Sequence, residues 1–147
     1  MTPARIAGFA YLAVVLTGLF ALAGVPSALS LVADNRQNVA LIAADPQLYR
    51  LGLLGLIANQ IAFVILPILL WRLLAPHGKT AASLMAAFAL VGVPLALSAV
   101  ALRLDALALL PQPAAATALD AARNRMLLAM TFWGLWLLPL GVLVWRT

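Results

Sequence analysis

Four long apolar stretches, separated by shorter segments that hold most of the charged residues, dominate the pattern of this 147-residue chain. They run from about 6 to 25, 51 to 74, 81 to 102 and 126 to 145. At 1.5 Å per residue, each can cross a hydrocarbon core roughly 30 Å thick. A helix satisfies its own backbone polar groups, as lipid requires. The pattern therefore predicts an all-α, integral membrane four-helix bundle, with residues 1–147 forming a single transmembrane domain.

The connections between these stretches contain further helical signals. Residues 27–49 are loosely amphipathic, which predicts a short interfacial helix before the second span. Asp45-Pro46 combines a capping side chain with a proline suited to a first turn, so the second helix should begin at Pro46. Thr80 can cap the third helix in the same way. Residues 114–125 have high helix propensity and should extend the fourth helix outward.

Each predicted span has one proline within it or at its end, so we expect kinked helices. In a membrane such kinks can splay helices into vestibules, or they can reflect only the higher frequency of proline in membrane helices. These residues are Pro26, Pro67, Pro94 and Pro139. The first span also resembles a signal peptide, with Arg5 before its apolar run, but that run is longer than an ordinary signal sequence. We expect it to be retained.

Composition and charge narrow the class of protein further. The chain is 66% hydrophobic and 9% charged, with a mean hydropathy of +1.11, which excludes a water-soluble fold at this length. The net charge of +5 comes from basic residues at the ends of apolar runs. These form no stripe with interleaved aromatic residues, so we expect no nucleic-acid partner. The absence of cysteine excludes disulfides and thiolate metal sites.

The distribution of Lys and Arg between the two sides is nearly even, four against five, and so does not fix the orientation. The short basic turn between Arg72 and Lys79, with Trp71 and Trp145 as anchors, favours cytoplasmic termini. We therefore expect a multi-pass protein of the bacterial cytoplasmic membrane with both termini inside.

Asn59 and Gln60 are adjacent amides within the second span, where a polar group needs a partner. Gly52, Gly55 and Asn59 follow one another at three- and four-residue steps, so they share one side of the predicted helix, along which another helix can approach closely. The pattern predicts an interhelical hydrogen bond and helix packing. The alternative is a polar lining for a lipid headgroup, a quinone-like ligand or a permeant solute.

The fourth span places its large and small residues on different faces. Trp133 and Trp136 are three residues apart and share a face, whereas Gly134 and Gly141 are seven apart and share another. We expect helix packing and lipid contact from these faces. The Trp face is also a candidate surface for a partner subunit or a flat hydrophobic ligand.

No set of residues for catalysis can be assembled from the sequence. It offers no paired carboxylates within a span and no Ser-His-Asp set, and His77 alone cannot hold a metal or a haem. We therefore expect no enzyme, no catalytic residue, no metal and no cofactor. Arg103, Arg123 and Arg125 are assigned to the second polar connection, and Arg50 directly precedes the second span. All four lie on the acid-bearing side, where they can form ion pairs or bind lipid phosphate. Asp120 and Arg123 have helical spacing for a pair.

Several short stretches carry a resemblance to a bacterial membrane-protein family known as domain of unknown function 4386. The stretches are Ala4 to Gly8 with Tyr11-Leu12, Arg50 to Gly52, Trp71 to Pro76 with Lys79 and Val91-Gly92, and Gly134 to Thr147. The resemblance implies an uncharacterised integral membrane protein and assigns no catalytic residue. It also implies a further pair of helices that this chain lacks, so the chain is either a natural short form or a bundle completed by something else.

These observations together predict a non-enzymatic structural or accessory subunit of a membrane assembly. Its expected partners are the lipid bilayer and other membrane subunits or copies of itself. The alternative is a small binding or transport protein for a lipid-like or apolar solute, using the sector that contains Asn59 and Gln60.

Overall fold

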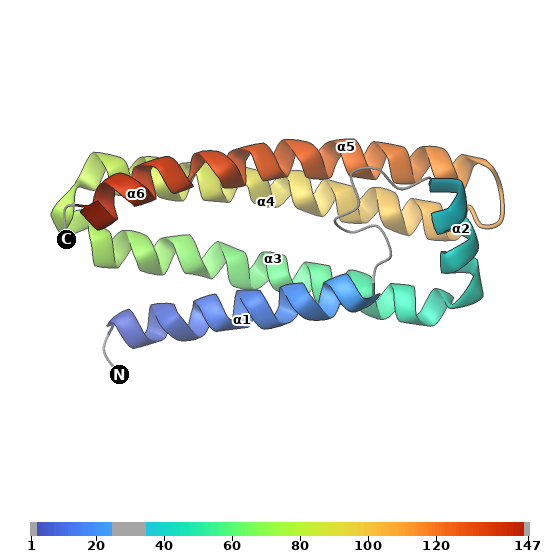
Figure 1. The fold of residues 1–147 in the computed structure, drawn as a ribbon, viewed down its shortest axis with the longest axis horizontal. Helices are drawn as coiled ribbons and strands as arrows, with labels where there is room; N and C mark the ends of the chain where they lie inside the picture. Colours follow the sequence, from blue (N-terminus) through green and yellow to red (C-terminus); the bar gives the residue numbers. More distant parts are fainter. Residues whose placement is uncertain (1–2, 25–34, 146–147) are drawn as a thin grey trace.

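The computed structural model of the chain describes residues 3–24 and 35–145, which are almost entirely helical with no strand among them. The elements are α1 Pro3–Gly24, α2 Asn35–Ala44, α3 Pro46–Leu74, the short 3₁₀ helix η1 Ala75–His77, α4 Lys79–Ala108, α5 Ala114–Leu135 and α6 Leu137–Trp145 (Figure 1). Within these described ranges, four apolar helical segments are long enough to cross a membrane. They are Ala4–Ala21, Pro46–His77, Lys79–Ala108 and Ala114–Trp145. The prediction of an all-α membrane helical bundle is confirmed.

The long helices run side by side, each antiparallel to the preceding one, with both ends of the chain at one end of the bundle (Figure 1). α1 packs mainly on α3, α3 packs also on α4, and α4 contacts both α5 and α6. α4 is therefore the central helix and α1 lies at an edge. Only 11% of the apolar window of α1 is buried, against 39% of that of α4. The expected short helix is α2, which lies across the opposite end of the bundle.

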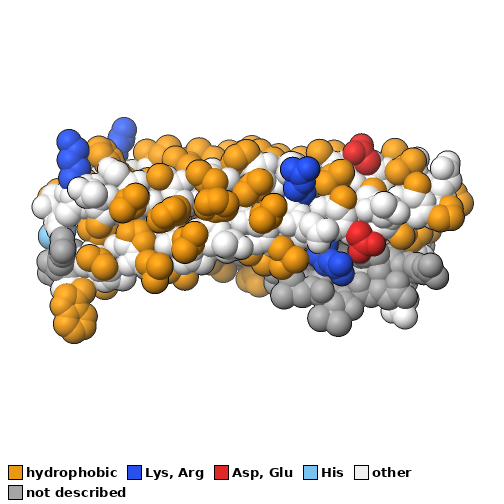
Figure 2. Space-filling view, turned by 90° about the horizontal axis from the view of Figure 1, so that it is seen from above, with side chains coloured by type: hydrophobic (Ala, Val, Ile, Leu, Met, Phe, Trp, Pro, Cys, Tyr) orange, Lys and Arg blue, Asp and Glu red, His pale blue; other side chains and the backbone are white. Residues whose placement is uncertain are grey.

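Charged side chains mark two levels along the bundle. On the face drawn in Figure 2, Lys and Arg lie near one end, and Arg and Asp lie in a second group toward the other end. The surface between these groups carries no charge in this view. An apolar belt between two charged levels is the distribution that a bilayer requires.

The starts of two helices test the capping predictions. Asp45 caps α3 as predicted, since its Oδ1 accepts a hydrogen bond of 3.0 Å from the Leu48 N–H. The prediction that Thr80 caps the next helix is wrong. α4 begins at Lys79, directly after Gly78, because η1 closes with a bond from the Gly78 N–H to the Ala75 carbonyl and leaves Gly78 extended.

The prolines affect their helices differently. Pro67 and Pro94 lie inside continuous helices, α3 and α4. The fourth span, expected as one helix, is instead divided at Trp136 into α5 and α6. Pro139 explains this position, because it has no N–H for the carbonyl of Leu135, four residues earlier. Pro26 lies outside the described residues.

Small residues form the contacts between helices. Ala96 and Ala99 of α4 face Ala122, Met126 and Ala129 of α5 in one buried cluster. Alanine side chains allow two helices to approach closely, which favours association where lipid removes the hydrophobic driving force. This packing holds α5 against α4 and so determines which side chains of the two helices face the interior of the bundle.

Candidate functional site

Asn59 joins α3 to α1 near the middle of the bundle. Its Nδ2 donates to the Val14 carbonyl at 2.7 Å and to the Thr17 hydroxyl at 3.1 Å. Thr17 itself donates to the Ala13 carbonyl, as threonine does in helices. The Asn59 amide is therefore used to hold the edge helix in place.

Gln60, the adjacent amide, points into the interior and is only 3% exposed. Its Nε2 lies 3.4 Å from Asn59 Oδ1, and its Oε1 has no hydrogen-bond partner. An unpaired buried acceptor costs about 1–3 kcal/mol. The two amides therefore differ, since one is bonded across a helix interface and the other presents a free acceptor to the core.

The glycine line of α3 lies where α1 approaches. A Cβ at Gly55 would stand 2.8 Å from Phe20 Cδ1, so the exposed Phe20 ring would have to move, and 3.4 Å from the Ala21 Cα, so the backbone of α1 already lies within contact distance of this position. Gly52 is also buried. Gly18 of α1 has the same role from the other side, with its Cβ position 3.3 Å from Asn59 Nδ2. Sequence spacing on α3 alone could not identify Gly18.

The two Trp residues of the fourth span lie inside the bundle. Phe63 of α3 contacts both rings, with centroid separations of 5.1 Å to Trp133 and 5.7 Å to Trp136. Trp133 also lies against Gly92 of α4, and its Nε1 has no hydrogen-bond partner. Trp136 is 8% exposed. Phe63 and Gly92 therefore pack against these rings within the bundle, and the hypothesis that the Trp face docks a partner subunit or a flat hydrophobic ligand stays a prediction.

The glycines of the fourth span face outward instead. Gly134 and Gly141 are exposed, and a Cβ at either would meet no atom within 4 Å. The smooth face of this span therefore does not pack within the bundle. It is open to lipid or to another protein.

A second polar site lies at the end of the bundle where α2 packs. Arg103 is 3% exposed and Tyr49 is 1% exposed. The Tyr49 hydroxyl and Arg103 Nη1 have no hydrogen-bond partner. The two groups lie close enough to interact electrostatically. The assignment of Arg103 to a polar connection is wrong, because α4 continues to Ala108 and carries Arg103 into the core.

Sequence reasoning missed this site because a single Arg after an apolar run resembles an interfacial anchor. The available signal was the run Ala106-Leu107-Ala108, which continues the helical apolar pattern beyond Arg103. The predicted ion pair of Asp120 and Arg123 is present at 3.5 Å, with both side chains partly exposed. Such pairs contribute little to stability.

Other polar groups serve the turn between α3 and α4. Trp71 Nε1 donates to the Ser83 hydroxyl at 3.2 Å, which ties the two helices together beside η1. His77 is exposed there. Among the described residues no group of His, Asp and Glu side chains could hold a metal ion.

The sequence matches one protein family over residues 6–147, described as a domain of unknown function (DUF4386). No curated protein and no solved structure matches the chain. The matched range includes both polar sites and, apart from residues 4 and 5, all four apolar spans.

Proposed function

The chain belongs to the DUF4386 family of domains of unknown function, and on this premise we propose that it is a non-enzymatic structural or accessory subunit of a bacterial membrane assembly. The observation that carries the proposal is the position of α1. This helix is held by α3 and leaves most of its surface uncovered. An edge helix of this kind can bind a neighbouring subunit without disturbing the rest of the bundle.

The uncovered surface of α1 is large and apolar. Its exposed side chains, from 38% to 61% of their full area, are Ile6, Phe9, Tyr11, Leu12, Val15, Leu16, Leu19 and Phe20. Gly8 gives this surface a shallow groove, lined also by Arg5, Phe9 and Leu12. A groove beside a glycine allows another helix to approach closely.

Photo-crosslinking in native membranes tests this proposal. A photoreactive residue at Phe9 should give a protein adduct of defined mass, identified by mass spectrometry. Leu54 of α3 is the matched control, because both side chains are 61% exposed on apolar spans. We expect Leu54 to give mainly lipid adducts. Equal, diffuse labelling at both positions contradicts a subunit contact at α1.

A second function, binding or transport of a lipid-like or apolar solute, is favoured by one observation. Gln60 Oε1 and Trp133 Nε1 are an unpaired acceptor and an unpaired donor inside one bundle. Purification in mild detergent with mass spectrometry distinguishes the two functions. Other proteins that co-purify in stoichiometric amounts support the function as a subunit. A monomer or homodimer that carries a defined small molecule supports the function as a binding or transport protein.

We also propose that both termini are cytoplasmic, supported by the basic turn around η1 at the same end of the bundle. The chain has no cysteine, so single cysteines can report accessibility. His77 and Gln112 are exposed at opposite ends. An impermeant maleimide should label Gln112→Cys on intact cells and His77→Cys only after permeabilisation. The reverse pattern overturns this orientation.

A further inference from the structure

Arg103 is a buried positive charge that the described residues do not neutralise. A guanidinium stays protonated in proteins, so burial cannot remove its charge. The effective cost of burying an unpaired ion is several kcal/mol. Among the described residues Arg123 forms an ion pair with Asp120, and Asp45 accepts the N–H that caps α3. Asp105 is exposed, two residues from Arg103 on the same helix.

The charge balance at this end of the bundle leaves an excess cation. The basic residues assigned to this side are Arg36, Arg50, Arg103, Arg123 and Arg125, and the acids are Asp34, Asp45, Asp105 and Asp120. Five cations and four acids leave one positive charge however the pairs are formed. The buried position of Arg103 makes it the most costly one to leave without an anion.

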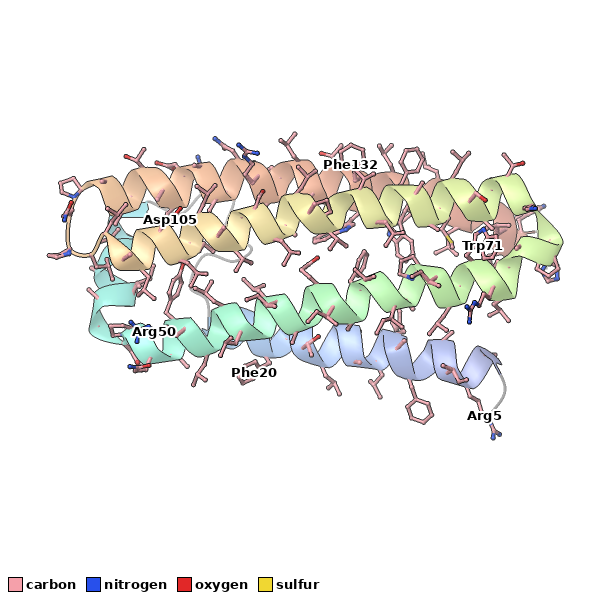
Figure 3. The ribbon with its side chains drawn as sticks, turned by 180° about the vertical axis from the view of Figure 1, so that it is seen from behind. Arg5, Phe20, Arg50, Trp71, Asp105 and Phe132 are labelled. Carbon is pink, nitrogen blue, oxygen red and sulfur yellow. The ribbon has the colours of Figure 1, made fainter. Side chains whose placement is uncertain are left out.

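The depth of Arg103 matches the level of lipid headgroups. It follows Lys79 by 24 residues on α4, a rise of about 36 Å. On α3, Arg50 precedes Arg72 by 22 residues, a rise of about 33 Å. Both separations are close to a hydrocarbon thickness of roughly 30 Å. Figure 3 shows Arg50 of α3 and Asp105 of α4 at this same end of the bundle.

The surroundings of the site suit an anion attached to an apolar molecule. Tyr49 belongs to an apolar cluster with Ile42 of α2, Leu53, Val100 and Leu119. The Tyr49 hydroxyl is a donor without a hydrogen-bond partner, and it lies within the electrostatic reach of the guanidinium. Guanidinium groups bind phosphate oxygens through parallel N–H bonds, and a hydroxyl donor adds a third.

We propose that Arg103 and the Tyr49 hydroxyl bind a phosphate group at the end of the bundle closed by α2. The phosphate belongs to a phospholipid headgroup or is a free anion. The chemistry of recognition is the same in both cases, namely charge-assisted hydrogen bonds from two buried donors. The proposal does not depend on whether the protein is an accessory subunit.

Native mass spectrometry of the full chain, titrated with phosphatidylglycerol, tests the site. We expect one tightly bound lipid, with affinity about tenfold lower in Arg103→Gln, as expected for loss of a charged hydrogen bond. Tyr49→Phe, which removes only the hydroxyl, should weaken binding less. Arg125→Gln removes an exposed arginine from the same end and should bind like the natural chain.

Two further arms identify the source of the phosphate and guard against misfolding. Inorganic phosphate that competes with the lipid at millimolar concentration indicates a site for the free anion, and failure to compete indicates a headgroup site. In both cases the proposal requires that Arg103→Gln bind the lipid more weakly than the natural chain. If Arg103→Gln does not fold, Tyr49→Phe and Arg103→Lys must both weaken binding. Equal affinities of these variants and Arg125→Gln overturn the proposal.

Discussion

Replacing Gly92 by alanine should separate α4 from α5. The position lies inside α4, and a Cβ there would stand 2.7 Å from Trp133 Cδ1 and 2.9 Å from Trp133 Cε2. Real Cβ atoms do not approach carbon this closely, so either the indole or the helix must move. The indole is rigid and also packs against Phe63, with ring centroids 5.1 Å apart. A shift of the helix is therefore the expected response.

The size of the effect follows from two opposed terms. Overpacking of a well-packed interior costs about 1–3 kcal/mol. Alanine in place of glycine favours a helix by up to about 1 kcal/mol. Gly134→Ala gains the helix preference of alanine without any overpacking, because its Cβ would meet no atom within 4 Å. We expect Gly92→Ala to be less stable than Gly134→Ala by about 1–3 kcal/mol.

Unfolding in mixed micelles with increasing dodecyl sulfate, followed by resistance to proteolysis, measures this difference. The double variant Gly92→Ala with Trp133→Phe should recover much of the loss, because a phenyl ring lacks the crowded pyrrole atoms. The Trp133 Nε1 makes no hydrogen bond, so this second change removes none. Equal stability of Gly92→Ala and Gly134→Ala, or no rescue, refutes the packing argument.

Three further predictions follow from local contacts. Asn59→Leu should destabilise the fold by about 0.6–2 kcal/mol, because it removes hydrogen bonds between α3 and α1. Gln60→Leu should destabilise the fold less, because the Gln60 Oε1 has no partner to lose. Equal losses of stability for the two variants in the micelle assay contradict this prediction. Pro139→Ala should join α5 to α6, and slow hydrogen exchange at the new amide would demonstrate it; fast exchange points to another cause of the break. Asp45→Ala should cost about 1 kcal/mol and speed exchange of the Leu48 amide, and unchanged exchange would exclude capping.

The sequence alone determined which segments are long and apolar enough to cross a membrane, and how one helix begins. Span lengths depend on hydropathy and on the need for each helix to satisfy its own backbone, and both are local properties. The cap at Asp45-Pro46 is local as well. Even the division of the fourth span was readable in principle, because Pro139 acts on a carbonyl only four residues away.

Only the tertiary structure decided which residues face one another. In a helix that is apolar on all sides, no amphipathic pattern distinguishes the face toward lipid from the face toward a neighbouring helix. The sequence therefore could not show that Trp133 packs inside while Gly134 faces out, or that Asn59 is bonded while Gln60 keeps a free acceptor. The burial of Arg103 likewise depends on how α2, α3, α4 and α5 come together at one end, a long-range arrangement that no local pattern specifies.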